Sequence, residues 1–283
     1  MTQKKTILDF LKMKANAEPI SFVTAYDYPM ATFAERAGLD MILVGDSVGM
    51  VVYGYENTLP VTMEQMIYHT EAVRRGAPNT FVVGDMPFAS YQSSSEAAVL
   101  SAMELVKKTN CDAIKLEGGV RVVERIKAIS DAGIPVMGHI GLTPQSSSQL
   151  GGFKAQGRTA ESALQLLEDA LAVEKAGAFA LLLEAVPPEV GGLISSRLSI
   201  PVLGIGGGDR VDGQLLIVGD MLGLFESFTP KFVKKYTDLA SIITAALTHY
   251  RDDVKNRRFP EDIHCYKMAK GESERLQAML GDK

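Results

Sequence analysis

Four acidic residues each stand at the end of a short apolar segment that is typical of a buried β-strand. They are Asp46 in VGDS, Asp85 in VGDM, Glu117 in IKLEG and Glu184 in LLLEAV. An acid at a strand end is often only the N-cap of the following helix. Four such acids together indicate a shared site, because like charges held close together raise one another's pKa unless a cation lies among them.

Asp46, Asp85 and Glu117 are candidate metal ligands. All three supply hard oxygen donors, and no Cys or His cluster accompanies them in the sequence, which favours Mg2+ over Zn2+. Open positions on such an ion suit the carboxylate and ketone oxygens of a small 2-oxo acid. The ion then acts as a Lewis acid that stabilises an enolate, so the pattern predicts metal-assisted carbon–carbon bond chemistry.

Glu184 is the candidate general base. Ala180, Leu182 and Glu184 alternate along one strand and therefore share a face. An apolar flank of this kind raises the pKa of a carboxyl group toward the working range of a general base. We expect Glu184 to remove a proton from the carbon next to the polarised ketone.

Three further polar residues accompany these acids, and each has two interpretations. Lys115 shares a strand face with Glu117, where it is either a cation for a substrate oxygen or a partner in a structural ion pair with a neighbouring acid. Ser47 either offers its hydroxyl and amide to a carboxylate or caps a turn. His139 is either a proton carrier or a hydrogen-bonded structural histidine.

A repeated pattern of strands and helices is needed to bring these residues together. Segments such as AERAGLD, SDAGIP and EKAGAFA are variants of one helix-turn-strand joint. The pattern predicts an α/β fold, a (β/α)8 TIM barrel, in which right-handed crossovers deliver all strand ends to one rim. The strands are predicted at Ile20–Ala25, Met41–Gly45, Thr80–Gly84, Ala113–Leu116, Ile134–Gly138, Phe179–Glu184, Ile200–Ile205 and Leu215–Gly219.

A doubly wound open sheet is the competing fold. It favours a glycine-rich turn after the first strand, but Thr24-Ala25-Tyr26-Asp27 contains no glycine. The barrel predicts a single domain over 1–283, with an N-terminal helix at about 1–18 and a charged C-terminal tail at about 251–283. Residues 142–158 form a long polar loop that we expect to be functional or mobile.

Composition excludes several classes of partner. The net charge of −5 and the lack of a basic stripe argue against nucleic acid, and no apolar run is long enough to span a membrane. The N-terminal segment lacks the apolar core of a signal peptide, and Cys111 and Cys265 form no CxxC motif. These features predict a cytoplasmic protein.

Extended phrases of the sequence resemble the ketopantoate hydroxymethyltransferase family. They run in order from Thr24 to about His264 and include TAYDYPMATFAERAGLDMILVGDSVGM, FVVGDMPFASY, IKLEGG, PVMGHIGLTPQS, LLLEAVP, PVLGIGGG, DMLGLF and RRFPEDIH. The resemblance implies a barrel of the phosphoenolpyruvate/pyruvate type, Mg2+, and methylenetetrahydrofolate as the one-carbon donor. It also implies conversion of 3-methyl-2-oxobutanoate to 2-dehydropantoate, on the route to pantothenate and coenzyme A.

The resemblance also assigns roles residue by residue. It implies metal ligation by Asp46, Asp85 and Glu117, and proton removal by Glu184. It implies substrate binding by Asp46, Ser47, Asp85 and Lys115. The family usually forms a homodecamer of two pentameric rings. One departure is visible, because the family's GIGAG loop here has Gly207 in place of the alanine.

Two other functions stay open at this point. The first is a lyase or mutase with the same barrel, which cleaves a C–C or P–C bond in a 2-oxo acid without folate. The second is a non-catalytic barrel that only binds a 2-oxo acid or scaffolds a complex, and such a protein has no need of Glu184 on the rim. Folate-dependent product formation would distinguish the transferase from the lyase or mutase. Metal-dependent exchange of a substrate proton into solvent would distinguish an enzyme from a barrel that only binds.

Overall fold

Eight parallel strands pair in chain order, and the last strand pairs with the first to close a barrel. The protein is described here by a computed structural model, which covers residues 4–281. The predicted (β/α)8 barrel is therefore confirmed. The strands are β1 Ile20–Thr24, β2 Met41–Val44, β3 Phe81–Asp85, β4 Ala113–Glu117, β5 Val136–Gly141, β6 Ala180–Glu184, β7 Val202–Ile205 and β8 Gly213–Leu216.

The eighth strand begins earlier than the sequence pattern predicts. The expected segment was 215–219, but β8 already starts at Gly213, which pairs with Ile20 of β1. A side chain at Gly213 has no room, because a Cβ there would lie 2.4 Å from the carbonyl oxygen of Ile20. The remaining part of the predicted strand bends into the short helix α10, Val218–Met221, so the position of that prediction was wrong.

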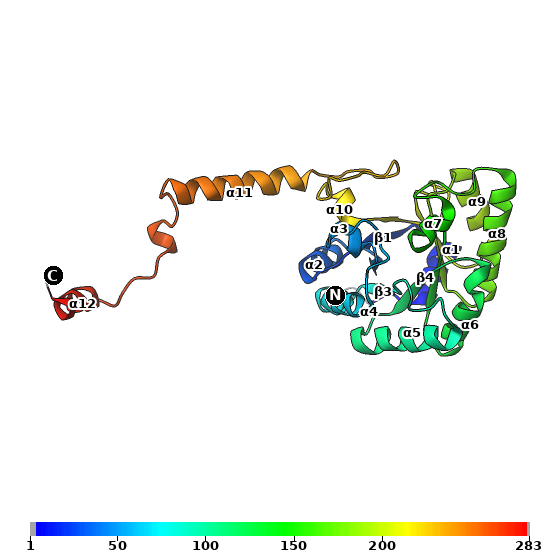
Figure 1. The fold of residues 1–283 in the computed structure, drawn as a ribbon, viewed down its shortest axis with the longest axis horizontal. Coiled ribbons are helices and arrows are strands. Elements are labelled where there is room, and N and C mark those ends of the chain that lie inside the picture. The colour runs from blue at the N-terminus through cyan, green and yellow to red at the C-terminus, as the bar shows by residue number, and fades with distance from the viewer. Residues whose placement is uncertain (1–3, 282–283) are drawn as a thin grey trace. The chain divides into compact units, whose positions relative to one another are not determined.

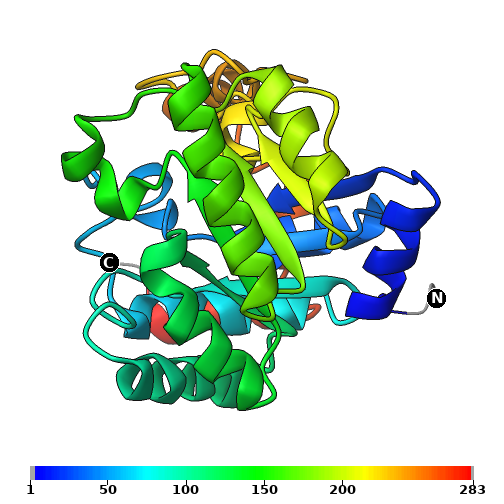
Figure 2. The same ribbon diagram turned by 90° about the vertical axis from the view of Figure 1, so that its right-hand side faces the viewer.

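Helices surround the strands and connect them (Figure 2). The helices α2, α4, α5 and α6 pack against one another in chain order (Figure 1). The main helices of the barrel are α1 Ile7–Ala15, α2 Tyr28–Arg36, α4 Met63–Gly76, α5 Ser95–Thr109, α6 Val123–Asp131, α8 Ala160–Lys175 and α9 Pro188–Arg197. The short helix α3, Val48–Val51, follows β2.

The interior of the barrel is a separate apolar cluster from the layer between strands and helices. Phe10 and Met13 of α1 belong to the interior cluster. The Phe10 ring packs edge-on against the Phe81 ring, with the two ring centroids 5.1 Å apart. Phe81 is the first residue of β3, so α1 packs near the N-terminal ends of the strands. The opposite, C-terminal rim is the end available for a ligand.

The predicted loop over 142–158 contains local structure. It holds a 3-10 turn at Pro144–Ser146 and the short helix α7, Ser147–Leu150, which ends at Gly151 in the left-handed conformation. The turn buries Gln145, although the segment is polar.

The chain from Thr237 onward forms a second compact unit. It contains α11, Leu239–Lys255, and α12, Glu272–Leu280. Helix α11 is amphipathic, yet the apolar residues along it are exposed: Ile242, Ile243, Leu247, Tyr250 and Val254. The predicted tail, 251–283, therefore begins inside α11. The single-domain organisation stays a prediction. None of the helices within 4–281 has the length and hydropathy to cross a bilayer.

Thr24, at the end of β1, holds the turn that follows β8. Its side chain is fully buried, and its Oγ1 accepts a hydrogen bond from the backbone N–H of Val218 at 3.0 Å. We predict that Thr24→Val lowers the free energy of unfolding by about 1–3 kcal/mol, because a buried N–H loses its acceptor. Urea unfolding followed by circular dichroism measures this. Thr24→Ser keeps the hydroxyl, so a loss as large in Thr24→Ser as in Thr24→Val would contradict this role.

Candidate active site

Strand register explains why the predicted site residues meet at one rim. Asp85 of β3 lies opposite Lys115 of β4, and Glu117 of β4 lies opposite His139 of β5. Lys115 and Glu117 are two residues apart on one strand and therefore share a face. Glu184 ends β6, the next strand around the barrel.

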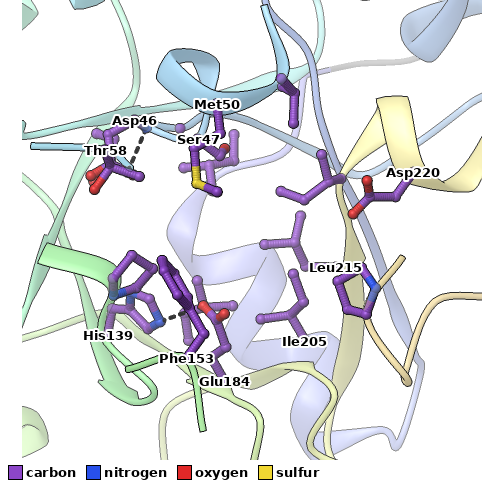
Figure 3. A pocket seen from close by; sticks show the side chains of 18 of the residues that line it. Asp46, Ser47, Met50, Thr58, His139, Phe153, Glu184, Ile205, Leu215 and Asp220 are labelled. Carbon is purple, nitrogen blue, oxygen red and sulfur yellow. Dashed lines mark hydrogen bonds and ion pairs between the residues drawn. The ribbon is translucent and has the colours of Figure 1, made fainter. Parts of the chain in front are cut away.

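These side chains line one cavity of about 400 Å³ (Figure 3). The structure thus brings together all the residues that the sequence predicted for the site, including His139, for which two interpretations were open. The members of the predicted set that line the cavity are Asp46, Ser47, Asp85, Lys115, Glu117, His139 and Glu184.

Lys115 is the cation at the centre of a buried acid cluster. Its Nζ lies 2.8 Å from both carboxylate oxygens of Asp85 and 3.5 Å from Oε1 of Glu117. Burial acts to lower the pKa of Lys115, but the charges of Asp85 and Glu117 outweigh it and raise that pKa. Lys115 therefore stays charged. The ion pair that the sequence left as one alternative is present, and the same side chain also faces the cavity.

Asp46 makes no ion pair of its own among the described residues. Its Oδ2 accepts a hydrogen bond from Nε2 of Gln145 at 2.9 Å, and its backbone N–H donates to Oδ2 of Asp85 at 3.0 Å. Burial, together with the charges of Asp85 and Glu117, raises the pKa of Asp46 well above its ordinary value. The ionised form of Asp46 is therefore disfavoured next to Asp85 and Glu117, and a further cation would favour it.

His139 links the acid cluster to Glu184. Its Nδ1 lies 3.3 Å from Oε1 of Glu117, and its Nε2 lies 3.2 Å from Oε2 of Glu184, in directions that suit ion pairs better than linear hydrogen bonds (Figure 3). Burial and the charge of Lys115 act to lower the pKa of His139, but the two carboxylates outweigh them and raise it to about 9. At neutral pH the ring is a cation that lies between two carboxylates. Glu184 thus faces both the cavity and this imidazolium.

Ser47 directs its side chain away from a capping role. It precedes helix α3, but its hydroxyl makes no cap hydrogen bond there. The hydroxyl instead lies 2.8 Å from the phenol oxygen of Tyr26, whose pKa is raised by burial. Ser47 is therefore positioned to offer a hydroxyl to a ligand in the cavity.

Gln145 is a site residue that the sequence analysis did not single out. Its backbone N–H donates to Oε2 of Glu117 at 3.0 Å, and its Nε2 donates to Oδ2 of Asp46 and to the carbonyl of Met86. Its Oε1 accepts from the hydroxyl of Tyr91 at 2.6 Å. Its signals in the sequence are its place in the long polar loop after the fifth strand and in the phrase PVMGHIGLTPQS.

The chemistry of the acid cluster fits a divalent cation. The candidate donors are all carboxylate oxygens, they are buried, and a cation among them would favour their ionised forms. Within the part of the chain that the structure describes, no three His, Cys, Asp or Glu side chains adopt the arrangement of a metal site, and Lys115 lies between two of the candidate ligands. The assignment of Asp46, Asp85 and Glu117 as metal ligands stays a prediction.

The fold and the cavity define a class: a parallel (β/α)8 barrel with a buried acidic site at its strand ends. Solved structures with this fold include a phosphoenolpyruvate phosphomutase from Streptomyces platensis subsp. rosaceus, with a TM-score of 0.59 and 16% identity over 97% of this chain and 96% of that one. Another is 2,3-dimethylmalate lyase, a member of the PEP mutase/isocitrate lyase superfamily, with a TM-score of 0.53 and 17% identity over 99% and 100% of the two chains. At such identities the likeness concerns the fold alone, and it agrees with the predicted (β/α)8 barrel.

Sequence comparison narrows this class to one family. The family profile described as ketopantoate hydroxymethyltransferase matches residues 4–262. The 3-methyl-2-oxobutanoate hydroxymethyltransferase of Alkaliphilus metalliredigens is 62% identical over 94% of each chain, and that of Geobacillus sp. strain WCH70 is 54% identical over 99% of each chain. The chain belongs to the ketopantoate hydroxymethyltransferase family.

The hydrogen bonds of Gln145 give a prediction for the acid cluster. We predict that Gln145→Met lowers kcat about 10- to 100-fold and the free energy of unfolding by about 1–3 kcal/mol, because the buried Asp46 carboxylate loses a donor. Steady-state assays and urea unfolding measure the two quantities. Gln149→Met, an exposed neighbour in the same segment, serves as the control. Equal behaviour of the two variants would show that Gln145 does not organise the site.

Proposed function

We propose that the protein transfers a hydroxymethyl group from methylenetetrahydrofolate to 3-methyl-2-oxobutanoate and forms 2-dehydropantoate, in the biosynthesis of pantothenate and coenzyme A. The names of its relatives support this activity. The single observation in the structure that carries the proposal is the position of Glu184. It faces the same cavity as Asp46, Asp85 and Lys115, so a base stands beside a site for an oxo acid.

Glu184 is the residue that starts the reaction. It accepts the proton from the branched carbon next to the ketone, as a positioned carboxylate does in general base catalysis. His139 holds the carboxylate of Glu184 through a contact of 3.2 Å and stays charged while the proton moves. The deprotonated branched carbon then bonds to the methylene carbon of the folate, whose two bonds to folate nitrogens break. Water supplies the hydroxyl oxygen of the new hydroxymethyl group. Tetrahydrofolate leaves with one proton on each of the two nitrogens, one from water and one that replaces the proton taken up by Glu184.

The other polar residues bind and orient the oxo acid. Lys115 and the hydroxyl of Ser47 face the cavity and suit the oxygens of the substrate. Mg2+ held by Asp46, Asp85 and Glu117 supplies, when bound, the Lewis acidity that polarises the ketone. The raised pKa of Asp46 supports this choice of cofactor, because a cation among the three carboxyl groups would favour their ionised forms.

The proposed transferase needs a folate, whereas the lyase or mutase alternative does not. The position of Glu184 argues against the other alternative, a barrel that only binds an oxo acid. Membership of the hydroxymethyltransferase family favours a transferase. A non-catalytic barrel has no reason to direct a carboxylate into the cavity beside a charged histidine.

The proposal extends to the assembly and location of the protein. We infer a homodecamer from the family resemblance, and the exposed apolar residues of α11 support self-association, because a stripe of this kind favours a protein partner. We infer a cytoplasmic location because both Cys111 and Cys265 are free thiols.

Replacing the base tests its role. We predict that Glu184→Gln lowers kcat by about two to four orders of magnitude, because an amide cannot accept the proton. Binding of the oxo acid, measured by calorimetry, should change little. Glu189→Gln, an exposed glutamate of α9, is the matched control. Turnover of Glu184→Gln near that of the control would remove Glu184 from its role.

Replacing one candidate ligand tests the metal assignment. We predict that Asp85→Asn weakens Mg2+ binding by at least about tenfold, because a neutral amide replaces an anionic oxygen donor. Titration calorimetry with Mg2+ alone measures this without reference to turnover. Asp209→Asn, an exposed residue outside the cavity, is the control. An unaltered titration in Asp85→Asn would contradict the ligand assignment.

A further inference from the structure

One end of the cavity is built differently from the acid cluster. The part of the lining contributed by the chain from Leu215 onward is apolar and rich in phenylalanine. Its members are Leu215, Ile217, Phe225, Phe228, Pro230 and Phe232. Asp220 is the one charged residue among the described residues of this part of the lining.

Asp220 points into the cavity from the side opposite His139, and Ile205 and Leu215 lie between it and Glu184 (Figure 3). It is the third residue of the short helix α10, which is attached to β1 through the hydrogen bond between Thr24 and Val218. Asp220 is therefore held on the barrel rim at a distance from the proposed base.

The carboxylate of Asp220 has no hydrogen-bond donor among the described residues. It makes no hydrogen bond or ion pair within residues 4–281, and it accepts no amide at the start of α10. Only 6% of the residue is exposed, and burial raises its pKa to about 6 against the opposing charge of Lys235. At neutral pH it is still largely an anion. The carboxylate lines the cavity and has no protein donor, so its position favours a ligand that supplies donors.

The size of the cavity leaves room for a second reactant at this end. A volume of about 400 Å³ lies in the range of pockets that hold drug-sized ligands. A small branched oxo acid bound near Lys115 and Glu184 would occupy only the polar end. The apolar end then lies next to the carbon that must receive the one-carbon unit.

The pteridine ring of a folate has the chemistry that this end requires. It is flat and aromatic, which suits phenylalanine side chains. Its 2-amino group and the neighbouring ring N–H form a pair of parallel donors, and a carboxylate accepts such a pair in a bidentate arrangement, as it does from a guanidinium. We propose that Asp220 is the pterin anchor, whose two carboxylate oxygens accept the 2-amino and N3 hydrogens of the folate while Phe228 and Phe232 line the ring. This inference rests on the proposed function, because that function makes a folate the second reactant.

Close packing around Phe232 holds the aromatic end of the cavity in place. A Cβ on Gly206 would lie 2.5 Å from the Phe232 ring, so the phenylalanine packs directly on the glycine at the end of β7. Gly206 has a φ of +76°, a conformation that glycine adopts without strain. The segment that carries the aromatic residues is thus fixed to the rim near Asp220.

The test compares binding of tetrahydrofolate and of 2-desamino-2-methyltetrahydrofolate, which lacks the amino donor. We expect Asp220→Asn to weaken tetrahydrofolate binding about 10- to 100-fold by titration calorimetry, because a charged acceptor is lost. The KM for methylenetetrahydrofolate should rise in the same proportion, and the KM for the oxo acid should move by less than about threefold. Glu226→Gln, an exposed acid of the same segment, is the matched control.

The analogue separates a pterin anchor from a merely structural acid. The wild-type protein should prefer tetrahydrofolate over the desamino analogue about 10- to 100-fold, and Asp220→Asn should lose most of that preference. A preference that is the same in both proteins would overturn the proposal. The absence of a preference in the wild type would overturn it even if the variant fails to fold. Product formation by the wild-type protein tests the proposed function separately. If product forms and Asp220→Asn binds tetrahydrofolate normally, only the pterin anchor is wrong.

Discussion

The site depends on one constraint, which is the placement of several buried carboxylates around a single buried lysine. Lys115 pairs closely with Asp85 and more loosely with Glu117, whereas the Asp46 carboxylate accepts from the neutral amide of Gln145. Such an arrangement is costly in a protein interior, because each charge has left water. It persists because the closed barrel fixes the strands that carry these residues, and because hydrogen bonds from Gln145 satisfy two of the carboxylates.

The same constraint connects the fold to the chemistry. Parallel strands in register deliver Asp85, Lys115, Glu117 and His139 to neighbouring positions on one rim, and β6 adds Glu184. The imidazolium of His139 lies between Glu117 and Glu184, so the cluster and the proposed base are parts of one electrostatic unit. A cation among the clustered carboxyl groups would favour their ionised forms, which supports the proposed divalent cation. The apolar opposite end accounts for the proposed folate subsite.

Much of the site was predictable because it follows from strand ends. Apolar runs located six of the eight strands to within about two residues, and β5 runs three residues past its predicted end at Gly138. The acids at these strand ends had to meet at the rim of a barrel. The last strand was misplaced because the apolar run continues past Leu216 into α10, whereas pairing starts at Gly213, which has no side chain to mark it. Gln145 and Asp220 were missed because neither follows from the end of a strand. Asp220 lies in the short helix α10, after β8. The contact between Gln145 and Asp46 joins residues 99 positions apart, and it depends on the shape of a loop that no periodicity encodes.

The proposed reaction starts when Glu184 removes the proton from the branched carbon of an oxo acid held at the acid cluster. The most direct measurement is proton NMR of 3-methyl-2-oxobutanoate in D2O with the wild-type protein and Mg2+ and without folate. We expect the signal of the branched-carbon hydrogen to disappear much faster than in a protein-free solution, and a chelator to abolish the effect. Exchange at the protein-free rate would contradict proton removal at this site, whatever the family likeness.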